Sequence, residues 1–459
     1  MKIHILGICG TFMGGIAVLA KQAGHEVSGC DANVYPPMST QLEEQGIRLT
    51  EGFSAADIPG DVDEVVIGNA MSRGNEAVEY VLNNNVSYVS GPEWLAKHVL
   101  NQRWVLAVAG THGKTTTSSI LAWILEYAEL NPGFLIGGIP GNFGLSARIG
   151  EMPFFVVEAD EYDTAFFDKR SKFIHYHPRT AVLNNLEFDH ADIFEDLDAI
   201  KKQFHHFVRT IPGDGLIIKN GEDENIQAVL EQGCWSQTAA FHKQHDPAHS
   251  DDDWSIGKAS EDGSSFDVLL DGKAVATVNW NLHGSHNRMN ALAAIAAAQH
   301  AGVPVELSCE ALAEFKGIKR RLEVRGMVND ITVYDDFAHH PTAIEETLVA
   351  MKERQGSGRL YAVLEPRSNT MRMGVHKENL ANALQGADEI CLYQPDGLDW
   401  NLDDVISRSK VPAGLFSTTE EIISHLSSVA TAGDHILIMS NGGFEGIHQR
   451  MLAALEKAQ

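Results

Sequence analysis

One glycine-rich turn constrains this chain more than any other segment, because it stands between an apolar run and a helical pattern. The apolar run covers residues 104–108, and the helical pattern covers 118–126. The turn between them contains, in order, Gly110, Thr111, His112, Gly113, Lys114, Thr115 and Thr116. At such a strand-to-helix turn, backbone N–H groups, the free helix N-terminus and a lysine ammonium converge on a phosphate group, and a hydroxyl reaches Mg²⁺. The segment therefore predicts a site for the β- and γ-phosphates of a nucleoside triphosphate.

This turn is a shortened variant of the eight-residue phosphate-binding loop. The strict pattern has a glycine where this chain has Val108. A Gly-Lys-Thr triplet also occurs by chance, so an ordinary glycine-bearing turn is the alternative interpretation. The predicted strand before the turn and the predicted helix after it favour the phosphate site, with Lys114 at the phosphates and Thr115 at Mg²⁺.

Length and charge narrow the class of protein. The 459 residues predict about three domains, and 44% hydrophobic with 21% charged residues excludes wholesale disorder. The net charge is −27, from 35 basic and 62 acidic side chains, which argues against a nucleic-acid partner. Any anionic ligand must therefore be held by local groups.

The chain carries no sign of membrane insertion or secretion. It contains no run of about 18 apolar residues. Met1 leads almost directly into the strand-like run 3–6 without a signal-peptide pattern, so we expect a cytoplasmic location. Its five cysteines show no C-x-x-C spacing, which argues against a disulfide framework or a zinc site.

A β-turn-α unit opens the first predicted domain, which closes with a helix expected over 92–100 and ends near residue 103. Its turn contains Gly7, Gly10 and Gly14, and the next strand ends at Asp31, where doubly wound folds bind a ribose. The dinucleotide pattern G-x-G-x-x-G fails, because Cys9 and Phe12 occupy its second and third glycine positions. A nucleotide-sugar diphosphate suits the helix terminus better than NAD does, and glycines that only close a tight turn are the alternative.

Two strand ends in the central region carry candidate metal ligands. The apolar run 154–157 leads to Glu158, and the run 180–184 leads to His190. A carboxylate at the end of a strand beside the phosphate-binding turn is well placed to hold Mg²⁺ or its waters. For His190, a metal ligand is favoured over a hydrogen-bonded structural histidine because of its place at a strand end.

Two further groups of polar residues follow. Asn287 and Asn290 lie one helical turn apart, so both amides suit an adenine edge, and helix capping by Asn287 is the alternative. Between residues 233 and 279, short strands with a hairpin turn at Asp271-Gly272 are predicted. A histidine- and aspartate-rich stretch within them lacks regular ligand spacing and is interpreted as a surface loop that binds no metal. That stretch contains His242, His245, His249, Asp251, Asp252 and Asp253.

The third predicted domain begins after Gly317. Strands are expected over 323–328 and 331–334 with a turn at Asn329-Asp330, and α/β alternation continues beyond them. The loop 365–370 follows a strand and therefore sits where ligands bind. Its Arg367 could pair with a substrate carboxylate, and a surface arginine is the alternative.

Taken together, these segments resemble the Mur ligase family over nearly the whole chain. The likeness rests on the turn 110–116, Glu158, the segment 189–192, the segment 286–290, and Arg321 with Asp336 and His339. It implies an ATP-dependent amide ligase of bacterial cell-wall synthesis with an α/β fold in three domains. These would be a Rossmann-like UDP-sugar domain over 1–103, a P-loop-type central ATPase domain over 104–317, and a small Rossmann-like acceptor domain over 318–459.

Within the family, the chain looks most like the branch that joins UDP-N-acetylmuramate to the recycled tripeptide L-alanyl-γ-D-glutamyl-meso-diaminopimelate. Segments 7–15, 31–40, 175–179 and 365–370 carry this likeness. The sibling that adds L-alanine alone typically has a richer glycine run where Cys9 and Phe12 stand here.

The resemblance also implies roles for individual residues. Catalysis would depend on Lys114, Glu158, His190 and Arg321. ATP would be bound by Gly110, Thr111, His112, Gly113, Lys114, Thr115, Thr116, Asn287, Asn290, Arg321, Asp336 and His339, and Mg²⁺ by Thr115, Glu158 and His190. The UDP-sugar would be bound by Gly7, Gly10, Thr11, Gly14, Asp31 and Asn69, and the peptide by Arg367, Ser368 and Asn369. Family members also have a lysine, sometimes carbamylated, on the helix after the histidine, and both Lys201 and Lys202 fit that position.

Three other functions compete with this hypothesis. The nearest is the same chemistry with L-alanine as acceptor, which acceptor-dependent phosphate release would separate. A nicotinamide-dependent oxidoreductase built on the first domain would bind NAD(P)H, and a non-catalytic nucleotide sensor would bind ATP without releasing phosphate.

Overall fold

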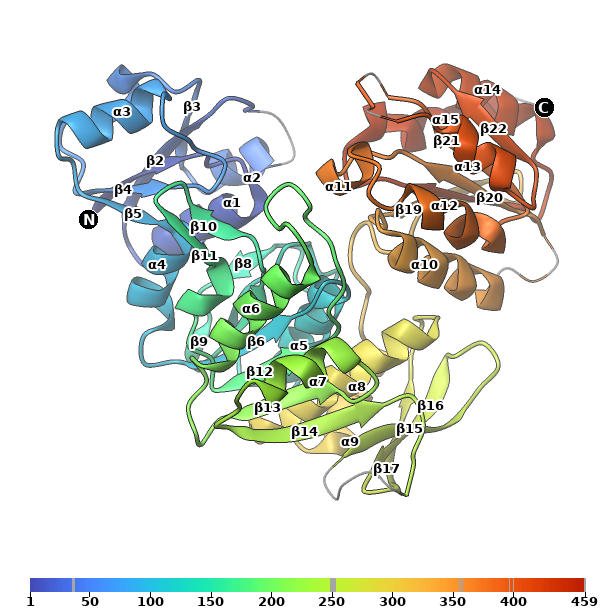
Figure 1. The fold of residues 1–459 in the computed structure, drawn as a ribbon, viewed down its shortest axis with the longest axis horizontal. Helices are drawn as coiled ribbons and strands as arrows, with labels where there is room; N and C mark the ends of the chain where they lie inside the picture. Colours follow the sequence, from blue (N-terminus) through green and yellow to red (C-terminus); the bar gives the residue numbers. More distant parts are fainter. Residues whose placement is uncertain are drawn as a thin grey trace.

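The computed structural model describes residues 1–34, 38–247, 253–354, 356, 358–395, 397–398 and 400–457. It contains three α/β units, each built on its own main sheet (Figure 1). In that view the first unit lies at the upper left, the central unit below it, and the third unit at the upper right. Among the described helices, none is long and apolar enough to cross a membrane.

The first unit is a five-stranded parallel sheet in the order β3-β2-β1-β4-β5. Its strands are β1 (Lys2–Leu6), β2 (Glu26–Asp31), β3 (Arg48–Glu51), β4 (Glu64–Ile67) and β5 (Tyr88–Ser90). Its helices are α1 (Thr11–Gln22), α2 (Met38–Glu44), α3 (Glu76–Asn83) and α4 (Gly91–Leu95). This strand order is that of a doubly wound nucleotide-binding fold. The single helix expected over 92–100 is instead α4 followed by a π-helical turn, Ala96–Leu100.

The central unit has ten strands in the order β17-β16-β15-β14-β13-β12-β6-β9-β7-β8. The seven from β15 to β7 are parallel, and antiparallel strands complete both edges. Their bounds are β6 Trp104–Ala109, β7 Pro132–Leu135, β8 Ala147–Arg148, β9 Glu151–Ala159, β12 Thr180–Leu183, β13 Leu216–Asn220, β14 Gln237–His242, β15 Trp254–Ala259, β16 Ser265–Leu270 and β17 Lys273–Asn279. Its helices are α5 (Lys114–Tyr127), α6 (Leu197–Val208), α7 (Glu224–Glu231), α8 (Ser285–His300) and α9 (Val305–Ala313), and a hairpin of β10 (Asp163–Ala165) and β11 (Asp168–Ser171) projects from it.

Strand β6 shows how the central core is organised. Val105 and Ala107 pack into the cluster that contains α6, whereas Leu106 and Val108 pack into the cluster with α5 and α8. This alternation is the two-residue period of a strand buried on both faces. The first of these clusters continues without a break into the first unit, where α1 packs against the central sheet. At that contact, a Cβ atom on Gly15 would lie 2.2 Å from the side chain of Leu135.

The third unit is a six-stranded sheet in the order β18-β19-β23-β20-β21-β22, parallel except for β18. Its strands are β18 (Glu323–Val328), β19 (Ile331–Asp336), β20 (Leu360–Leu364), β21 (Glu389–Tyr393), β22 (Ala413–Phe416) and β23 (His435–Met439). Its helices are α10 (Pro341–Arg354), α11 (Asn369–Arg372), α12 (Lys377–Ala383), α13 (Asp403–Arg408), α14 (Thr419–Val429) and α15 (Ile447–Lys457).

Two predicted turns are confirmed, and one helix start was wrong. Residues 271–272 and 329–330 all have left-handed backbone angles and join antiparallel strands. Helix α5 begins at Lys114 rather than at residue 118. Its first turn carries the β-branched residues 115–117, which weaken the helical signal in sequence, and the buried side chains of that turn compensate for it.

Candidate active site

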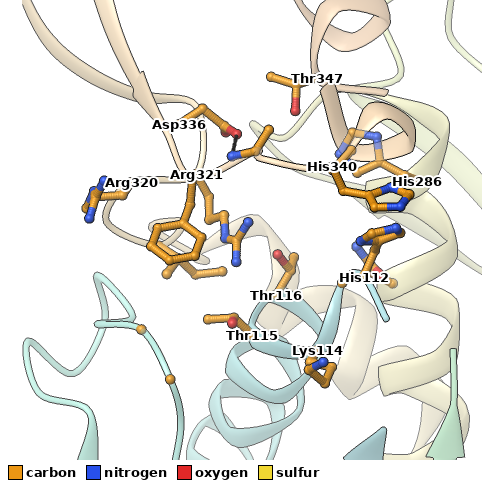
Figure 2. Close-up of a pocket in the computed structure, with 18 of the residues that line it drawn as sticks. His112, Lys114, Thr115, Thr116, His286, Arg320, Arg321, Asp336, His340 and Thr347 are labelled. Carbon is orange, nitrogen blue, oxygen red and sulfur yellow. Dashed lines mark hydrogen bonds between the residues drawn. The ribbon is translucent and has the colours of Figure 1, made fainter. Parts of the chain in front are cut away.

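A single cavity of about 1240 Å³ collects residues from all three units. Thr11 comes from the first unit, the turn 111–116 and Glu158 come from the central unit, and Arg321 and Asp336 come from the third. Figure 2 shows Lys114, Thr115 and Thr116 at the start of α5, with Arg320 and Arg321 above them. The phosphate-binding turn predicted from sequence therefore opens into a space that all three units enclose.

The start of α5 presents backbone N–H groups to this space. Gly110 and Gly113 have φ angles of 148° and 77°, and Gly113 caps α5 without any side-chain hydrogen bond to the helix. The first N–H groups of α5 therefore lack a side-chain cap, and the helix dipole adds partial positive charge there. This end of α5 is suited to an anion, as predicted.

Two buried asparagines lie directly behind the turn. Asn184 follows β12 and donates from Nδ2 to Asn290 Oδ1 at 2.8 Å, and the Thr117 hydroxyl donates to the same oxygen at 3.1 Å. A Cβ atom on Gly113 would lie 2.4 Å from Asn184 Nδ2 and from Asn290 Oδ1. The path of the turn is thus fixed by two amides that leave room only for glycine.

Lys114 is held in a buried network of charges. Its ammonium donates to Glu161 Oε2 at 2.7 Å, and His190 Nε2 lies 3.1 Å from Glu161 Oε1. Burial alone would lower the pKa of Lys114, but the charges of Glu161 and Asp160 outweigh burial and raise it. Burial would also raise the pKa of Glu161, but Lys114 and His190 lower it. At neutral pH the lysine and the carboxylate are therefore both charged.

Oxygen ligands for a cation lie next to this network. The Thr115 hydroxyl donates to Glu158 Oε1 at 3.1 Å, and the Gly137 N–H donates to Glu158 Oε2 at 2.7 Å. Burial raises the pKa of Glu158 against the opposing effects of the Gly137 bond and of Lys114. In a second group, one ligand atom from each of Asp160, Glu161 and His190 lies within 4.8 Å of the others.

The central and third units meet at a second charged cluster. Glu187 Oε2 lies 3.2 Å from His112 Nε2 and 3.6 Å from His340 Nδ1, and it accepts a hydrogen bond from the Thr342 hydroxyl at 2.7 Å. Burial opposes ionisation of Glu187, but the bonds from His112 and Thr342 lower its pKa to about 2. Nearby, the Thr370 hydroxyl donates to the Asp189 carboxylate at 2.9 Å.

Arg321 is the third unit's main contribution to the cavity. Its guanidinium lies 5.1 Å from the ring centre of Phe337 and points toward the start of α5 (Figure 2). The Asp336 carboxylate accepts the backbone N–H groups of Leu322 at 2.7 Å and Ala338 at 2.8 Å, so it fixes the segment that carries Arg321. The resulting geometry directs a cation at the phosphate-binding turn.

Known proteins share this architecture. Family models match residues 2–103 (Mur ligase family, catalytic domain), 108–298 (Mur ligase middle domain) and 320–442 (Mur ligase, glutamate ligase domain). Relatives from Haemophilus influenzae and Escherichia coli are 55% and 56% identical over 455 and 458 residues, which is at least 99% of each chain. The chain belongs to the Mur ligase family. Both relatives are named UDP-N-acetylmuramate--L-alanyl-gamma-D-glutamyl-meso-2,6-diaminoheptandioate ligase.

Solved structures agree with the assignment of this Mur ligase. A murein peptide ligase from Psychrobacter arcticus is 49% identical, with a TM-score of 0.77 over 99% of both chains. A UDP-N-acetylmuramate-alanine ligase from Thermotoga maritima has a TM-score of 0.82 over the full length of both chains at 23% identity, which shows a shared fold. The three-domain α/β architecture expected from the sequence is therefore confirmed.

The structure brings many predicted residues of this Mur ligase into one cavity, but not all of them. Asn287 and Asn290 line the cavity, and Asn287 donates to the carbonyl of His283 at 2.7 Å. Helix α8 is capped by Gly284, so the alternative of capping by Asn287 was wrong. Other predicted residues that line the cavity are Thr11, Thr111, His112, Gly113, Lys114, Thr115, Thr116, Glu158, His190, Arg321, Asp336, His339, Arg367, Ser368 and Asn369.

The residues predicted to bind the UDP-sugar in the first unit mainly make contacts around the turn between β1 and α1. Asp31 accepts the backbone N–H groups of Cys9 at 2.9 Å and Asn33 at 3.1 Å. Gly14 is buried beneath the Met38 side chain, where a Cβ atom would lie 2.5 Å from the sulfur. Asp31 and Gly14, like Gly7, Gly10 and Asn69, are not among the described residues that line the cavity, and their contact with a UDP-sugar stays a prediction.

Two further predictions from the sequence concerned a lysine on the helix after His190 and a polar stretch, 242–253, that binds no metal. Lys201 lies 3.8 Å from Asp198, Lys202 is exposed, and neither lines the cavity. In the histidine- and aspartate-rich stretch, His242 Nε2 lies 3.7 Å from Asp253 Oδ2. His249, Asp251 and Asp252 lie outside the described residues.

Sequence reasoning missed Glu161, Asn184 and Glu187 as site residues. Asn184 and Glu187 both follow β12, and Glu161 follows β9. A usable signal was present, since both strands end beside β6 and the segments after them had already supplied Glu158 and His190.

Proposed function

We propose that this Mur ligase joins UDP-N-acetylmuramate to L-alanyl-γ-D-glutamyl-meso-diaminopimelate with consumption of ATP, as in peptidoglycan recycling. The carrying observation is the single cavity in which Lys114, Glu158 and Arg321 converge from two units while the first unit contributes Thr11. The two relatives named for this reaction are more than half identical to the chain over nearly its full length.

Phosphoryl transfer is the first chemical step of the proposed reaction. A carboxylate is a poor acyl donor, so the lactyl carboxylate of UDP-N-acetylmuramate takes the γ-phosphoryl group and ADP leaves. The resulting acyl phosphate is attacked by the peptide amine, the C–N bond forms, phosphate leaves and the amine loses a proton. Lys114 and Arg321 offset the repulsion between the anionic carboxylate and the triphosphate.

The residues at the turn suit ATP and magnesium. The Thr115 hydroxyl and the Glu158 carboxylate are hard oxygen ligands of the kind Mg²⁺ prefers. Bound Mg²⁺ supplies neutralisation of phosphate charge. His190, the turn 110–116, Asn287, Asn290, Asp336 and His339 complete the proposed ATP and metal site.

Each of the three units binds a different substrate in this proposal. Residues 1–103 bind the UDP-sugar at the exposed N-terminus of α1, whose cap Gly10 makes no side-chain hydrogen bond. Residues 104–317 bind ATP, and residues 318–459 bind the peptide near Arg367, Ser368 and Asn369. These nucleotide substrates favour the predicted cytoplasmic location, which cell fractionation tests.

The tripeptide is favoured over L-alanine as the acceptor. Relatives named UDP-N-acetylmuramate--L-alanine ligase are 30–32% identical, against 55–56% for those named for the tripeptide. Family membership also removes the grounds for a nicotinamide-dependent oxidoreductase or a non-catalytic sensor.

Acceptor-dependent phosphate release tests the proposal. Purified protein receives ATP, Mg²⁺ and UDP-N-acetylmuramate, with either the tripeptide or L-alanine. We expect release with the tripeptide, little with L-alanine, and none from Lys114→Ala. Lys169→Ala is the matched control, because this exposed lysine pairs with Asp163 in the hairpin, away from the cavity lining. Equal release with L-alanine would contradict the acceptor, and normal turnover by Lys114→Ala would contradict the phosphate site.

A further inference from the structure

Glu161 binds the Lys114 ammonium, which is the group expected to contact phosphate in the proposed function. Its two carboxylate oxygens are each taken by a different cationic or hydrogen-bonding side chain, Lys114 at 2.7 Å and His190 at 3.1 Å. Only 12% of the Lys114 side chain and 2% of the Glu161 side chain are exposed. The ammonium at the phosphate-binding turn is therefore already neutralised within the protein.

Glu161 is fixed in place by the base of the β10–β11 hairpin. The Ser171 hydroxyl donates to the Glu161 carbonyl at 2.6 Å, and the Lys172 N–H donates to the Tyr162 carbonyl at 2.9 Å. Lys114, in contrast, is a flexible side chain on the first residue of α5. When the two separate, we expect the lysine to move and the carboxylate to stay.

We propose that Glu161 is a positioning residue that holds Lys114 while the site lacks nucleotide and yields it to the phosphates when nucleotide binds. The carboxylate thus stands in for a phosphate oxygen. It keeps a buried lysine charged, and it makes weakly bound anions such as free phosphate compete with a resident anion. The proposal rests on nucleotide binding at Lys114, as proposed above.

Nearby carboxylates distinguish this exchange from a general effect of charge. Asp160 is the neighbouring residue, but it accepts from Lys172 at 2.8 Å rather than from Lys114. Asp160→Asn therefore removes the same charge at almost the same place while leaving the Lys114–Glu161 pair intact. Asp163, which pairs with exposed Lys169 at 2.6 Å, offers a control further along the same hairpin.

ADP affinity without Mg²⁺ is the first measurement. Isothermal titration calorimetry in EDTA compares the full-length protein with Glu161→Gln, Asp160→Asn and Asp163→Asn. We expect Glu161→Gln to bind ADP roughly tenfold more tightly, because a charge-assisted bond no longer has to be broken. Asp163→Asn should match the original protein, and Asp160→Asn should change less than Glu161→Gln.

The effect of ADP on thermal unfolding supplies a readout that a merely structural role would not move. Without nucleotide, Glu161→Gln should have a lower melting temperature than the original protein, since Lys114 loses its charged partner. Saturating ADP should reduce this difference in melting temperature. If Glu161→Gln does not fold, Glu161→Asp replaces it, because aspartate keeps the charge but is too short to reach Lys114 as well. It should shift the ADP affinity and the melting-temperature difference in the same directions.

The outcomes separate the two proposals. If the original protein binds no ADP, the proposed nucleotide site itself fails. If it binds ADP but Glu161→Gln shows the same affinity and an unchanged melting-temperature difference, the exchange is overturned. Equal tightening by Asp160→Asn and Glu161→Gln would also overturn it, because the general field would then explain the effect.

Discussion

Replacing Gly113 with alanine tests whether the asparagines behind the phosphate-binding turn fix its shape. Gly113 has a φ angle of 77°, and an added Cβ would lie 2.4 Å from both Asn184 Nδ2 and Asn290 Oδ1. Because both atoms belong to a buried hydrogen-bonded pair, the methyl group must either displace the amides or bend the turn.

The expected cost has two parts. Left-handed backbone costs a residue with a Cβ atom about 1–2 kcal/mol. Disturbing the Asn184–Asn290 bond and the Thr117–Asn290 bond costs roughly another 1–3 kcal/mol. We therefore expect Gly113→Ala to lower the free energy of unfolding of the central unit by about 2–5 kcal/mol.

Gly302→Ala is the matched control. Gly302 lies after the end of α8 in the same unit, with a φ angle of 96°, and no atom of the described residues lies within 4 Å of an added Cβ. It should therefore cost only the backbone part, about 1–2 kcal/mol. Denaturant unfolding followed by tryptophan fluorescence measures both variants, since the central unit contains Trp104, Trp123, Trp235, Trp254 and Trp280. Equal destabilisation by both substitutions would refute the packing argument.

Two further predictions concern the contact between units and the effect of pH. Thr370→Val removes the hydroxyl bound to Asp189, so it should weaken docking of the third unit by about 1.5–3 kcal/mol and raise the radius of gyration in small-angle scattering. Thr277→Val, which breaks a similar bond to Asp267 within one hairpin, should leave that radius unchanged. Burial lowers the pKa of His4 to about 4, so the folded protein disfavours the proton that the unfolded chain accepts below about pH 6.5. The free energy of unfolding should therefore fall from pH 6.5 toward pH 4, by about 2 kcal/mol at pH 5. In His4→Gln this part of the pH-dependent loss should be absent, which thermal unfolding at both pH values measures.

Much of the fold followed from local patterns, because each unit repeats apolar strands and amphipathic helices. The turns at 271–272 and 329–330 were predictable because Asp, Asn and Gly tolerate left-handed angles. Helices α7 and α9 and strand β22 were missed. All three are short, with eight, nine and four residues, and β22 is an edge strand, so tertiary packing decides their structure more than local pattern does.

The site was predictable where a motif coincided with a strand end. Lys114, Glu158 and His190 were found that way and do lie around one cavity. The pairing of Lys114 with Glu161 joins residues 47 apart, and that of Asn184 with Asn290 joins residues 106 apart. Such contacts depend on the strand order β12-β6-β9 and on the position of α8, which no local pattern specifies.

The position of Arg321 leads us to expect that it attracts a triphosphate to this acidic protein. The chain carries a net charge of −27, and Lys114 and Arg320 are each matched by a carboxylate, Glu161 at 2.7 Å and Asp335 at 3.5 Å. Within the part of the chain that the structure describes, Arg321 makes no ion pair and lies against the ring of Phe337. We therefore expect a phosphate that approaches the cavity to gain most from Arg321 first, since that contact breaks no existing ion pair. Because Arg321 belongs to the third unit and Lys114 to the central unit, we expect a nucleotide that binds to both to favour closure of the two units over it.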